Sequence, residues 1–396
     1  MMEDKFKVAF ISTFWTRLGG GEIGANLLKK GLEKKKVIVK ILTAQPIKED
    51  EKDILPINFK VPIPKEIILL GNPVLDMLLK KNIETAFKKN NYYPNVIHVQ
   101  NIYALPASVK VARKFKIPIV VTIREPLPKV LLHPYNFFIK FILNQILKSR
   151  NNILLKNLKE DCDKVIAVSD FIKDRMSRLG VPEEKLITIY NFPPKWEKLE
   201  TIGNKFKSAD ISKKMRLLYL GRLEKAKGIH ILLLALKKIL SQISKIELII
   251  AGEGPYERYL KELSQKLNLE KNVKFTGKIP FKKIGRLYIS ADIVCIPSVW
   301  PEPLSRVAYE AMSLEKPIIT SAVGGMSEAI EDGKTGLVVP PNNHEELANA
   351  LIKLIEDKEL RENMGREGKK SIKQKFDLEM SVENHLNLYK KMAKNK

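Results

Sequence analysis

The sequence predicts an α/β protein with two doubly wound domains, each built on a parallel sheet that helices cover on both faces. Three observations support this fold class. The chain has 396 residues, which is more than one hydrophobic core usually organises. Short runs of β-branched apolar residues alternate with amphipathic helical patterns, as is typical of parallel sheets buried on both faces. The alternation stops at Asn191 and restarts at about residue 214, so the series occurs twice.

The first series predicts an N-terminal domain over residues 1–192. It opens with a strand over residues 6–12, a glycine-rich turn (LGGGE) over residues 18–22, and a helix over about residues 23–34. Further strands are predicted over residues 37–42, 96–99, 117–123 and 164–169. Residues 193–213 are polar, basic and poor in aliphatic side chains, so we interpret them as a linker.

The second series predicts a C-terminal domain over residues 214–375. Its strands are expected over residues 216–221, 246–252, 272–277, 292–298, 316–321 and 335–340. Two helices follow over residues 344–357 and 359–373. A last helix, within about residues 376–396, comes after the final strand, and its pattern alone would let it pack on either domain. Ligands of doubly wound sheets bind at the carboxyl ends of the strands, so the two domains are expected to face each other across a cleft.

The composition is that of a folded globular protein, with 44% apolar and 29% charged residues. Cys162 and Cys295 lie beside or within apolar runs, so we interpret them as core thiols of a reducing compartment. The N-terminus lacks the pattern of a signal peptide, and the chain has no apolar run of 18 residues. We therefore expect a cytoplasmic protein, or one that is peripheral on the inner face of the cell membrane.

The net charge of +25 is divided between residues 1–200, with +14, and the rest of the chain, with +11, and it is uneven within the first half. Residues 101–160 contain 11 basic side chains and two acidic ones, a local charge of +9. Such a field attracts polyanions, for example nucleotide-sugars, anionic lipids or nucleic acid. Within this stretch, residues 129–160 combine six basic side chains with many apolar ones. They predict either a basic amphipathic helix on an anionic membrane or a core-packing helix with a lysine face.

The loop after the first strand of the second domain contains Arg222 and Lys227 and leads into a helix that begins near Gly228. Two cations beside the free N–H groups of a helix N-terminus predict a diphosphate site. In the next strand-to-helix loop, Gly254 would let the backbone approach a ligand closely, although a plain turn needs the same residue.

The segment from Pro297 to Glu310 carries the strongest signal. Glu302 and Glu310 are eight residues apart, or about two helical turns, so both carboxylates can face one cleft and accept hydrogen bonds from sugar hydroxyls. The N–H groups of Leu304 and Ser305, at the start of the helix, can bind a phosphate. By contrast, we interpret Asp161-Cys-Asp163 as a chance match to a metal-binding DxD motif, and no metal-ligand cluster is visible in the sequence.

These motifs together resemble a known family. The segments GRLEKAKG (221–228), GEGP (252–255) and PSVWPEPLSRVAYEAMSLEKPIITSAVGGMSEAIEDGKTGLVVPP (297–341) resemble the C-terminal domain of glycosyltransferase family 4. The N-terminal half resembles the family more loosely, through VVTIRE (120–125) and VIAVSDFIKDRMSRLGVPEEKLITIYN (165–191). The family consists of retaining transferases of GT-B fold, which implies two Rossmann-like domains and a last helix that returns to the N-terminal domain.

The resemblance also implies roles for individual residues. In the family pattern, Arg222 and Lys227 neutralise the donor diphosphate, and no metal or other cofactor is required. Glu310 binds the ribose of the nucleotide, and Glu302 meets the hydroxyls of the donor sugar. The positions that bring backbone to the donor phosphates are Gly20, Gly21, Gly254, Leu304 and Ser305.

Two departures from the family affect the first domain. Many relatives have a histidine where this chain has Arg124, and a second polar histidine where it has Gln100. The catalytic contact from this domain is therefore left open between His98 and Arg124.

We expect a hexosyltransferase that moves a sugar, with retention, from a nucleoside diphosphate sugar to a hydroxyl acceptor in polysaccharide, glycan or lipid-linked glycan biosynthesis. The acceptor would bind the N-terminal domain. One alternative is a sugar-nucleotide epimerase of the same fold. Another is a basic protein that binds nucleic acid or a membrane surface without catalysis, although only 7% of the residues are aromatic and no nucleic-acid-binding module is visible.

Overall fold

The computed structural model describes residues 5–13, 20–43, 53–57, 73–125, 127, 137–194, 196 and 214–395. The chain forms two compact units. The first contains residues 1–191 together with residues 378–396, and the second contains residues 192–377. Residues 197–213, most of the predicted linker, lie outside the described residues, as do residues 18 and 19 of the predicted glycine-rich turn and residues 128–136 of the basic segment.

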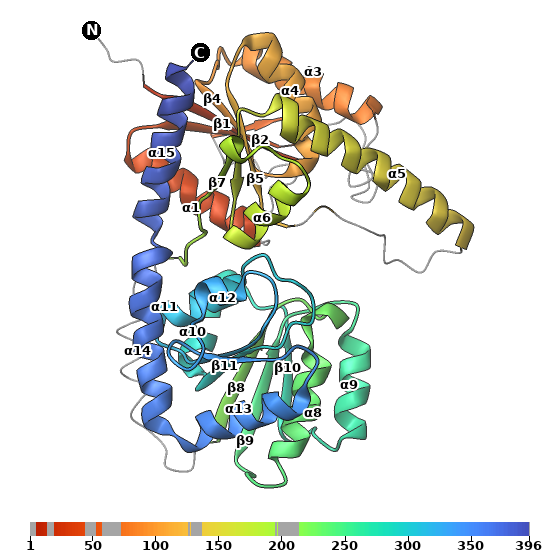
Figure 1. Ribbon diagram of the computed structural model, residues 1–396, viewed down its shortest axis with the longest axis vertical. Helices are drawn as coiled ribbons and strands as arrows, with labels where there is room; N and C mark the ends of the chain where they lie inside the picture. The colour runs from red at the N-terminus through yellow and green to blue at the C-terminus, as the bar shows by residue number, and fades with distance from the viewer. Residues whose placement is uncertain are drawn as a thin grey trace. The chain divides into compact units, whose positions relative to one another are not determined.

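The first unit has a parallel sheet of seven strands in the order β3-β2-β1-β4-β5-β6-β7. The strands are β1 (Lys7–Ser12), β2 (Ile38–Thr43), β3 (Ile54–Pro56), β4 (Val96–Val99), β5 (Ile119–Ile123), β6 (Lys164–Ala167) and β7 (Leu186–Thr188). The helices are α1 (Gly20–Lys34), α3 (Pro73–Lys89), α4 (Leu105–Phe115), α5 (Phe137–Lys156), α6 (Asp170–Arg178) and α15 (Leu378–Lys394) (Figure 1). Short helical turns precede α4 at Ile102–Ala104 and follow α5 at Asn157–Asp161.

The second unit repeats this plan with six parallel strands in the order β10-β9-β8-β11-β12-β13. The strands are β8 (Met215–Leu220), β9 (Ile246–Ala251), β10 (Val273–Gly277), β11 (Ile293–Ile296), β12 (Ile318–Ser321) and β13 (Leu337–Val339). The helices are α8 (Ile229–Ile239), α9 (Glu257–Lys266), α10 (Phe281–Ser290), α11 (Arg306–Ser313), α12 (Met326–Ala329), α13 (His344–Glu356) and α14 (Lys358–Lys375). The predicted class of two doubly wound domains is thus confirmed.

The strand order fixes where each unit can bind a ligand. In the first sheet the order reverses between β1 and β4, and in the second it reverses between β8 and β11. At such a reversal the connecting loops leave to opposite faces of the sheet and open a crevice beyond the carboxyl ends of the strands. The segments that follow β4, β5, β8 and β11 contain most of the residues that the sequence singles out.

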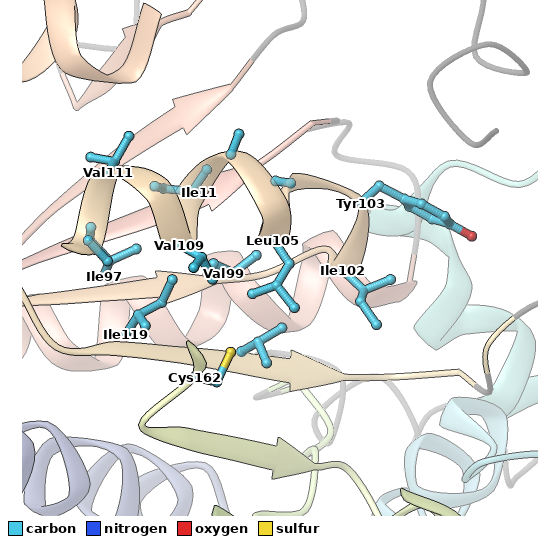
Figure 2. Packing of buried hydrophobic residues seen from close by; sticks show 14 of the residues in the cluster. Ile11, Ile97, Val99, Ile102, Tyr103, Leu105, Val109, Val111, Ile119 and Cys162 are labelled. Atoms are coloured by element: carbon cyan, nitrogen blue, oxygen red, sulfur yellow. The ribbon is translucent and has the colours of Figure 1, made fainter. Parts of the chain in front are cut away.

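A continuous hydrophobic core lies between the first sheet and its helices. In Figure 2, Leu105, Val109 and Val111 of α4 lie over Ile97, Val99 and Ile119 of the sheet. All of these side chains are at most 2% exposed. Ile102 and Tyr103 lie on the turn before α4, at the end of this core (Figure 2).

A buried ion pair connects three segments of the first unit. Arg150 of α5 forms a two-pronged contact with Asp76 of α3, and Arg150 Nη2 also donates to the carbonyl of Tyr103 at 3.0 Å. Both charged side chains are at most 9% exposed. α5 therefore has a buried face, and it is attached to the turn that carries Tyr103.

The last helix, α15, packs on α1 of the first unit, as the family resemblance implies. The contact is close: a Cβ placed on Gly31 of α1 would lie 2.3 Å from Cγ2 of Val382 on α15. The inner face of α15 buries His385 and Tyr389, which are 6% and 0% exposed. Among the described helices, none is both long and apolar enough to cross a membrane.

Candidate functional site

The loops after β8 and β11 interlock in the second unit. Gly228, at the start of α8, has φ = 69°, and a Cβ there would lie 1.7 Å from the carbonyl oxygen of Pro297. The N–H of Val299 donates to the carbonyl of Ala226 at 2.9 Å. Only glycine allows this close approach, and it holds the loop with the two cations against the segment that leads to Glu302.

The approach of the two loops pairs Lys227 with Glu302. Lys227 Nζ lies 2.6 Å from Oε1 of Glu302 and 5.3 Å from the centre of the Trp300 ring. The hydroxyl of Ser298 donates to the same carboxylate oxygen at 2.6 Å. Glu302 is only 6% exposed. The sequence-predicted cation and acid are therefore one hydrogen-bonded pair, although 75 residues separate them.

Arg222 is on the same loop, but its side chain extends into solvent. It is 74% exposed and its guanidinium pairs with Glu224 at 2.7 Å. A solvent-exposed pair of this kind costs little to break. Arg222 is therefore able to turn towards an anionic ligand, whereas Lys227 is already fixed by its partners.

Glu310 lies in a second, buried cluster on α11. Its carboxylate is 3% exposed and accepts hydrogen bonds from Arg306 Nε and, at 2.9 Å, from the Tyr288 hydroxyl. Burial raises the pKa of Glu310 above its ordinary value, although the Arg306 guanidinium opposes that shift. Each carboxylate oxygen already has one protein donor, so a ligand hydroxyl would have to share an oxygen with Tyr288 or Arg306.

The other sequence-predicted residues of this unit are mainly backbone positions. Leu304 and Ser305 are 9% and 8% exposed, and Ser305 is the residue before α11. A Cβ on Gly254 would lie 2.4 Å from the carbonyl oxygen of Leu223. Gly254 is thus required by the packing of two loops, which is the plain-turn interpretation, and approach to a ligand is not needed to explain it.

The first unit has a cavity of about 310 Å³ at the carboxyl ends of β1, β4 and β5. Its lining residues are Ser12, Gly21, Glu22, Ala25, Gln100, Asn101, Ile102, Tyr103, Thr122, Ile123, Arg124 and Glu125. The Arg124 guanidinium donates to the backbone carbonyl of Gln100 and, at 2.6 Å, to its side-chain Oε1. Gly21, in the first turn of α1, packs on the stem of Arg124, because a Cβ there would lie 3.0 Å from Cδ. Gly20 is the first residue of α1.

Of the two candidates for the catalytic contact, only Arg124 lines this cavity. His98 is fully buried, and both ring nitrogens have partners: the Tyr389 hydroxyl at 2.6 Å from Nδ1 and the Thr122 hydroxyl at 2.7 Å from Nε2. Burial, aided by His385 and Arg124, holds the pKa of His98 well below its ordinary value, so the ring is neutral. As the structure stands, His98 cannot touch a substrate directly.

The two carboxylates of the DxD-like triplet take part in local contacts. Asp161 pairs with Arg113, and Asp163 Oδ2 accepts from the Ile119 N–H at 2.7 Å. Within the described ranges, no group of three or more His, Cys, Asp or Glu side chains is arranged as metal ligands.

Several residues of these sites have no signal of their own in the sequence. Ser298, Trp300, Tyr288 and Arg306 surround the two glutamates, and Tyr389 reaches His98 from a helix 291 residues away. The cavity residue Gln100 is visible beforehand only as a departure from the family pattern.

Comparison with known proteins gives consistent matches over both units. Residues 18–192 match the family model Glycosyltransferase Family 4, and residues 202–371 match Glycosyl transferases group 1. The chain is 34% identical over 238 residues to the uncharacterized glycosyltransferase MJ1607 of Methanocaldococcus jannaschii, a match that covers 58% of this chain and 60% of that protein. It is 30% identical over 267 residues to spore coat protein SA of Bacillus subtilis, covering 63% of this chain and 70% of that protein. The first of these matches thus spans less than two thirds of the relative's length.

Solved structures share the fold over nearly the whole chain. One is the Anabaena protein Alr3699/HepE in complex with UDP and glucose, which is 20% identical and has a TM-score of 0.76 over 98% of this chain and 100% of that one. At this level of identity the likeness concerns the fold, which is GT-B. The family models, the Bacillus relative and the fold agree, and the chain belongs to the group 1 glycosyltransferases of glycosyltransferase family 4.

Proposed function

We propose that this protein is a retaining hexosyltransferase that moves a sugar from a nucleoside diphosphate sugar to a hydroxyl acceptor. The observation that carries the proposal is the Lys227–Glu302 pair at the strand-order reversal of the second sheet, with Arg222 on the same loop. This combination offers cations for a diphosphate and a carboxylate for sugar hydroxyls within one loop cluster. The UDP and glucose in the Anabaena structure support a nucleotide-sugar as the donor.

Stabilisation of the leaving group is the main chemical role of these residues. As the glycosidic bond breaks, negative charge develops on the departing diphosphate while the sugar becomes oxocarbenium-like. Lys227, already fixed by Glu302 and Ser298, needs little reorganisation to meet that charge, and Arg222 supplies a second cation when it leaves Glu224. Two protein cations perform the task that a metal ion performs elsewhere, so we propose that neither a metal nor another cofactor is required.

Glu302 and Glu310 have separate parts in donor recognition. Glu302 is proposed to accept hydrogen bonds from the sugar hydroxyls, with the N–H groups of Leu304 and Ser305 directed at a phosphate. Glu310 is proposed to bind the ribose, whose hydroxyl would share a carboxylate oxygen with Tyr288 or Arg306. A carboxylate oxygen can accept more than one hydrogen bond, so the protein contacts need not break.

We propose that the acceptor binds at the cavity of the first unit, where Arg124 contacts the reacting groups. Glu22, Asn101 and Glu125 line the same cavity and are suited to bind the hydroxyls of a glycan. The retention of configuration is proposed from membership of the family. A product whose anomeric configuration, read by NMR, is inverted relative to the donor would contradict that part of the proposal.

A lipid-linked glycan on an anionic, cytoplasmic membrane surface is the acceptor that the exterior of this unit suits best. Val74 and Met77 at the start of α3 are 56% and 58% exposed, and Ile146 and Ile153 of α5 are 41% and 42% exposed. Ile146 and Ile153 lie within the basic stretch 101–160, and exposed apolar side chains beside basic ones favour a headgroup surface. Co-sedimentation with vesicles should increase with the fraction of anionic lipid. Binding that does not depend on this fraction would contradict the proposal that the protein binds an anionic membrane surface.

The function is tested by a donor screen followed by transfer assays. UDP-, GDP- and ADP-sugars are compared for thermal stabilisation, because a ligand at 100 times its dissociation constant adds about 2.7 kcal/mol. With the stabilising donor, Arg222→Ala should lower transfer by about a hundredfold or more, the scale found on removal of one transition-state donor. Activity should persist in excess chelator.

Three outcomes would contradict the proposal. Conversion of the donor to its epimer without an acceptor would indicate an epimerase instead. Transfer at the wild-type rate by Arg222→Ala would separate this loop from the chemistry. Stabilisation by nucleic acid but by none of the sugar nucleotides would indicate a basic binding protein without catalysis.

A further inference from the structure

A chain of polar side chains connects α15 to the cavity of the first unit. On α15, the Tyr389 hydroxyl lies 2.6 Å from Nδ1 of His98, which belongs to β4. The amide nitrogen of Gln100 lies 2.9 Å from the same Nδ1, and the Gln100 Oε1 accepts from Arg124 at 2.6 Å. Tyr389 and His98 are both fully buried, whereas Gln100 and Arg124 line the cavity. These contacts therefore connect the buried interior of the first unit to the cavity.

These contacts favour one arrangement of protons, in which the Tyr389 hydroxyl and the Gln100 NH₂ group both donate to Nδ1 of His98. A guanidinium is a donor only, so the side-chain oxygen of Gln100 must face Arg124 and its NH₂ group must face His98. Nδ1 of His98 is then an acceptor, and the ring proton is on Nε2, from which it is donated to Thr122 Oγ1 at 2.7 Å. A protonated imidazole would direct an N–H at the Gln100 NH₂ group. The neutral ring thus fixes the amide, and the amide fixes the guanidinium.

The groups around His98 agree with this assignment. From α15, the His385 ring stacks on His98 with a centroid distance of 5.8 Å, and its own Nδ1 is bonded to the Ser381 carbonyl at 2.7 Å. Phe10 of β1 meets the His98 ring edge to face at 5.3 Å. Burial lowers the pKa of His98, and His385 and the Arg124 cation lower it further. No neighbour in this described set favours a charged ring.

We propose that Tyr389 and His98 are positioning residues for the transfer reaction, holding Gln100 and thereby Arg124 at the cavity. No residue of α15 lines the cavity, and Tyr389 is connected to it through this series of contacts. The proposal rests on the proposed function, in which Arg124 touches the reacting groups. Gly21 restricts the Arg124 stem from the other side, so a small change at Gln100 is expected to displace the guanidinium rather than be absorbed by the stem.

The kinetic test removes one hydroxyl far from the substrate. Tyr389→Phe keeps the ring and should lower kcat about tenfold with little change in the KM for the donor, because misplacement of a catalytic group by about 1 Å can cost up to about a hundredfold. The matched control is Tyr92→Phe. Tyr92 is also buried in the first unit, at 6% exposure, and its hydroxyl donates to the Val8 carbonyl at 2.8 Å. This control should lose comparable thermal stability and keep its kcat.

A double-mutant cycle separates positioning from general weakening. In an Arg124→Ala background, Tyr389→Phe should produce no further loss of kcat, because the group that it positions is absent. A tenfold loss that persists in this background would overturn the proposal, as would an unchanged kcat in the single variant.

An activity-independent measurement keeps this test distinct from that of the function. If the wild-type protein transfers no sugar from any nucleoside diphosphate sugar, the proposed function fails, but the contact chain can still be examined. In protein labelled with ¹⁵N-histidine, with the His98 signals assigned from a His98→Asn variant, the ring should be neutral and protonated at Nε2 at pH 7. A charged ring, or a proton on Nδ1, would overturn the contact chain itself.

Discussion

Lys227 and Arg222, the two cations of the 221–228 loop, should differ in their contribution to stability but contribute similarly to activity. Lys227→Met removes the ammonium but keeps a flexible apolar stem beside Trp300. The side chain of Glu302 is 8% exposed, and of its two donors described above only Ser298 then remains. A buried charged group that loses a partner costs about 1–3 kcal/mol. At about 2–4 °C per kcal/mol for a unit of this size, the melting temperature should fall by about 2–12 °C.

Arg222→Met is the matched control on the same loop. Its side chain is 74% exposed, so its pair with Glu224 contributes at most about 1 kcal/mol. Both substitutions should nevertheless lower kcat/KM about 10²- to 10³-fold, because each removes a cation from the leaving group. A double variant, Lys227→Met with Glu302→Gln, should recover the lost stability without recovering transfer, since it neutralises the unpartnered carboxylate.

These expectations are tested by thermal and urea unfolding, followed by circular dichroism, and by steady-state kinetics on the same preparations. Equal melting temperatures for Lys227→Met and wild type would show that the pair does not stabilise the loops. A loss of activity in the Lys227 variant alone would remove Arg222 from the diphosphate site.

Three further predictions concern groups elsewhere in the chain. Asp76→Ala should destabilise the first unit by about 3–5 kcal/mol in urea titrations, because Arg150 stays charged and buried, and Asp76→Leu with Arg150→Met should restore most of that loss. Burial lowers the pKa of His385 to about 4. Between about pH 6.5 and pH 4 the unfolded chain therefore binds more protons than the folded one, so the free energy of unfolding should decrease as the pH is lowered. His385→Phe should reduce the slope of unfolding free energy against pH by up to about 1.4 kcal/mol per pH unit. Burial raises the pKa of the Cys162 and Cys295 thiols to about 12, so neither should react with a maleimide at pH 8 in the folded protein, and both should react in urea.

The fold could be predicted because its strands are buried on both faces. Runs such as VIHV at 96–99 and IVVT within 117–123 do not alternate between apolar and polar residues, and their β-branched composition is typical of a parallel sheet covered on both faces. β3 and β7, each of three residues, lie outside the predicted strands. β7 lies within the segment 165–191 that resembles the family, in the short run LITIY at 186–190.

The candidate site could be predicted only where backbone topology decides it. Lys227 and Glu302 meet because both follow neighbouring strands of one sheet, and strand ends of a parallel sheet share an edge. The direction of Arg222 could not be predicted, since an exposed side chain on a loop is not fixed by any pattern. The partners of Glu310 were equally hidden, because no sequence period relates Tyr288 to α11.

His98 shows how a polar residue at a strand can mislead. The family pattern makes His98 a candidate for the catalytic contact, and the structure buries its ring outside the lining of the cavity. Its side chain points towards a helix whose packing partner the sequence left open, and that helix supplies the hydroxyl that holds the ring. The residue that reaches the cavity is Gln100, two positions later.

The return of α15 to the first unit has a consequence for how the protein is made. Residues 378–394 leave the ribosome after all of residues 192–377, so the earlier-synthesised unit waits for its last helix through the synthesis of the whole second unit. Until then Gly31 lacks its contact with Val382, and His98 lacks the α15 side chains that pack on its ring. The unit translated first is thus the one completed last, which exposes its apolar flank to chaperones and proteases for the longest time.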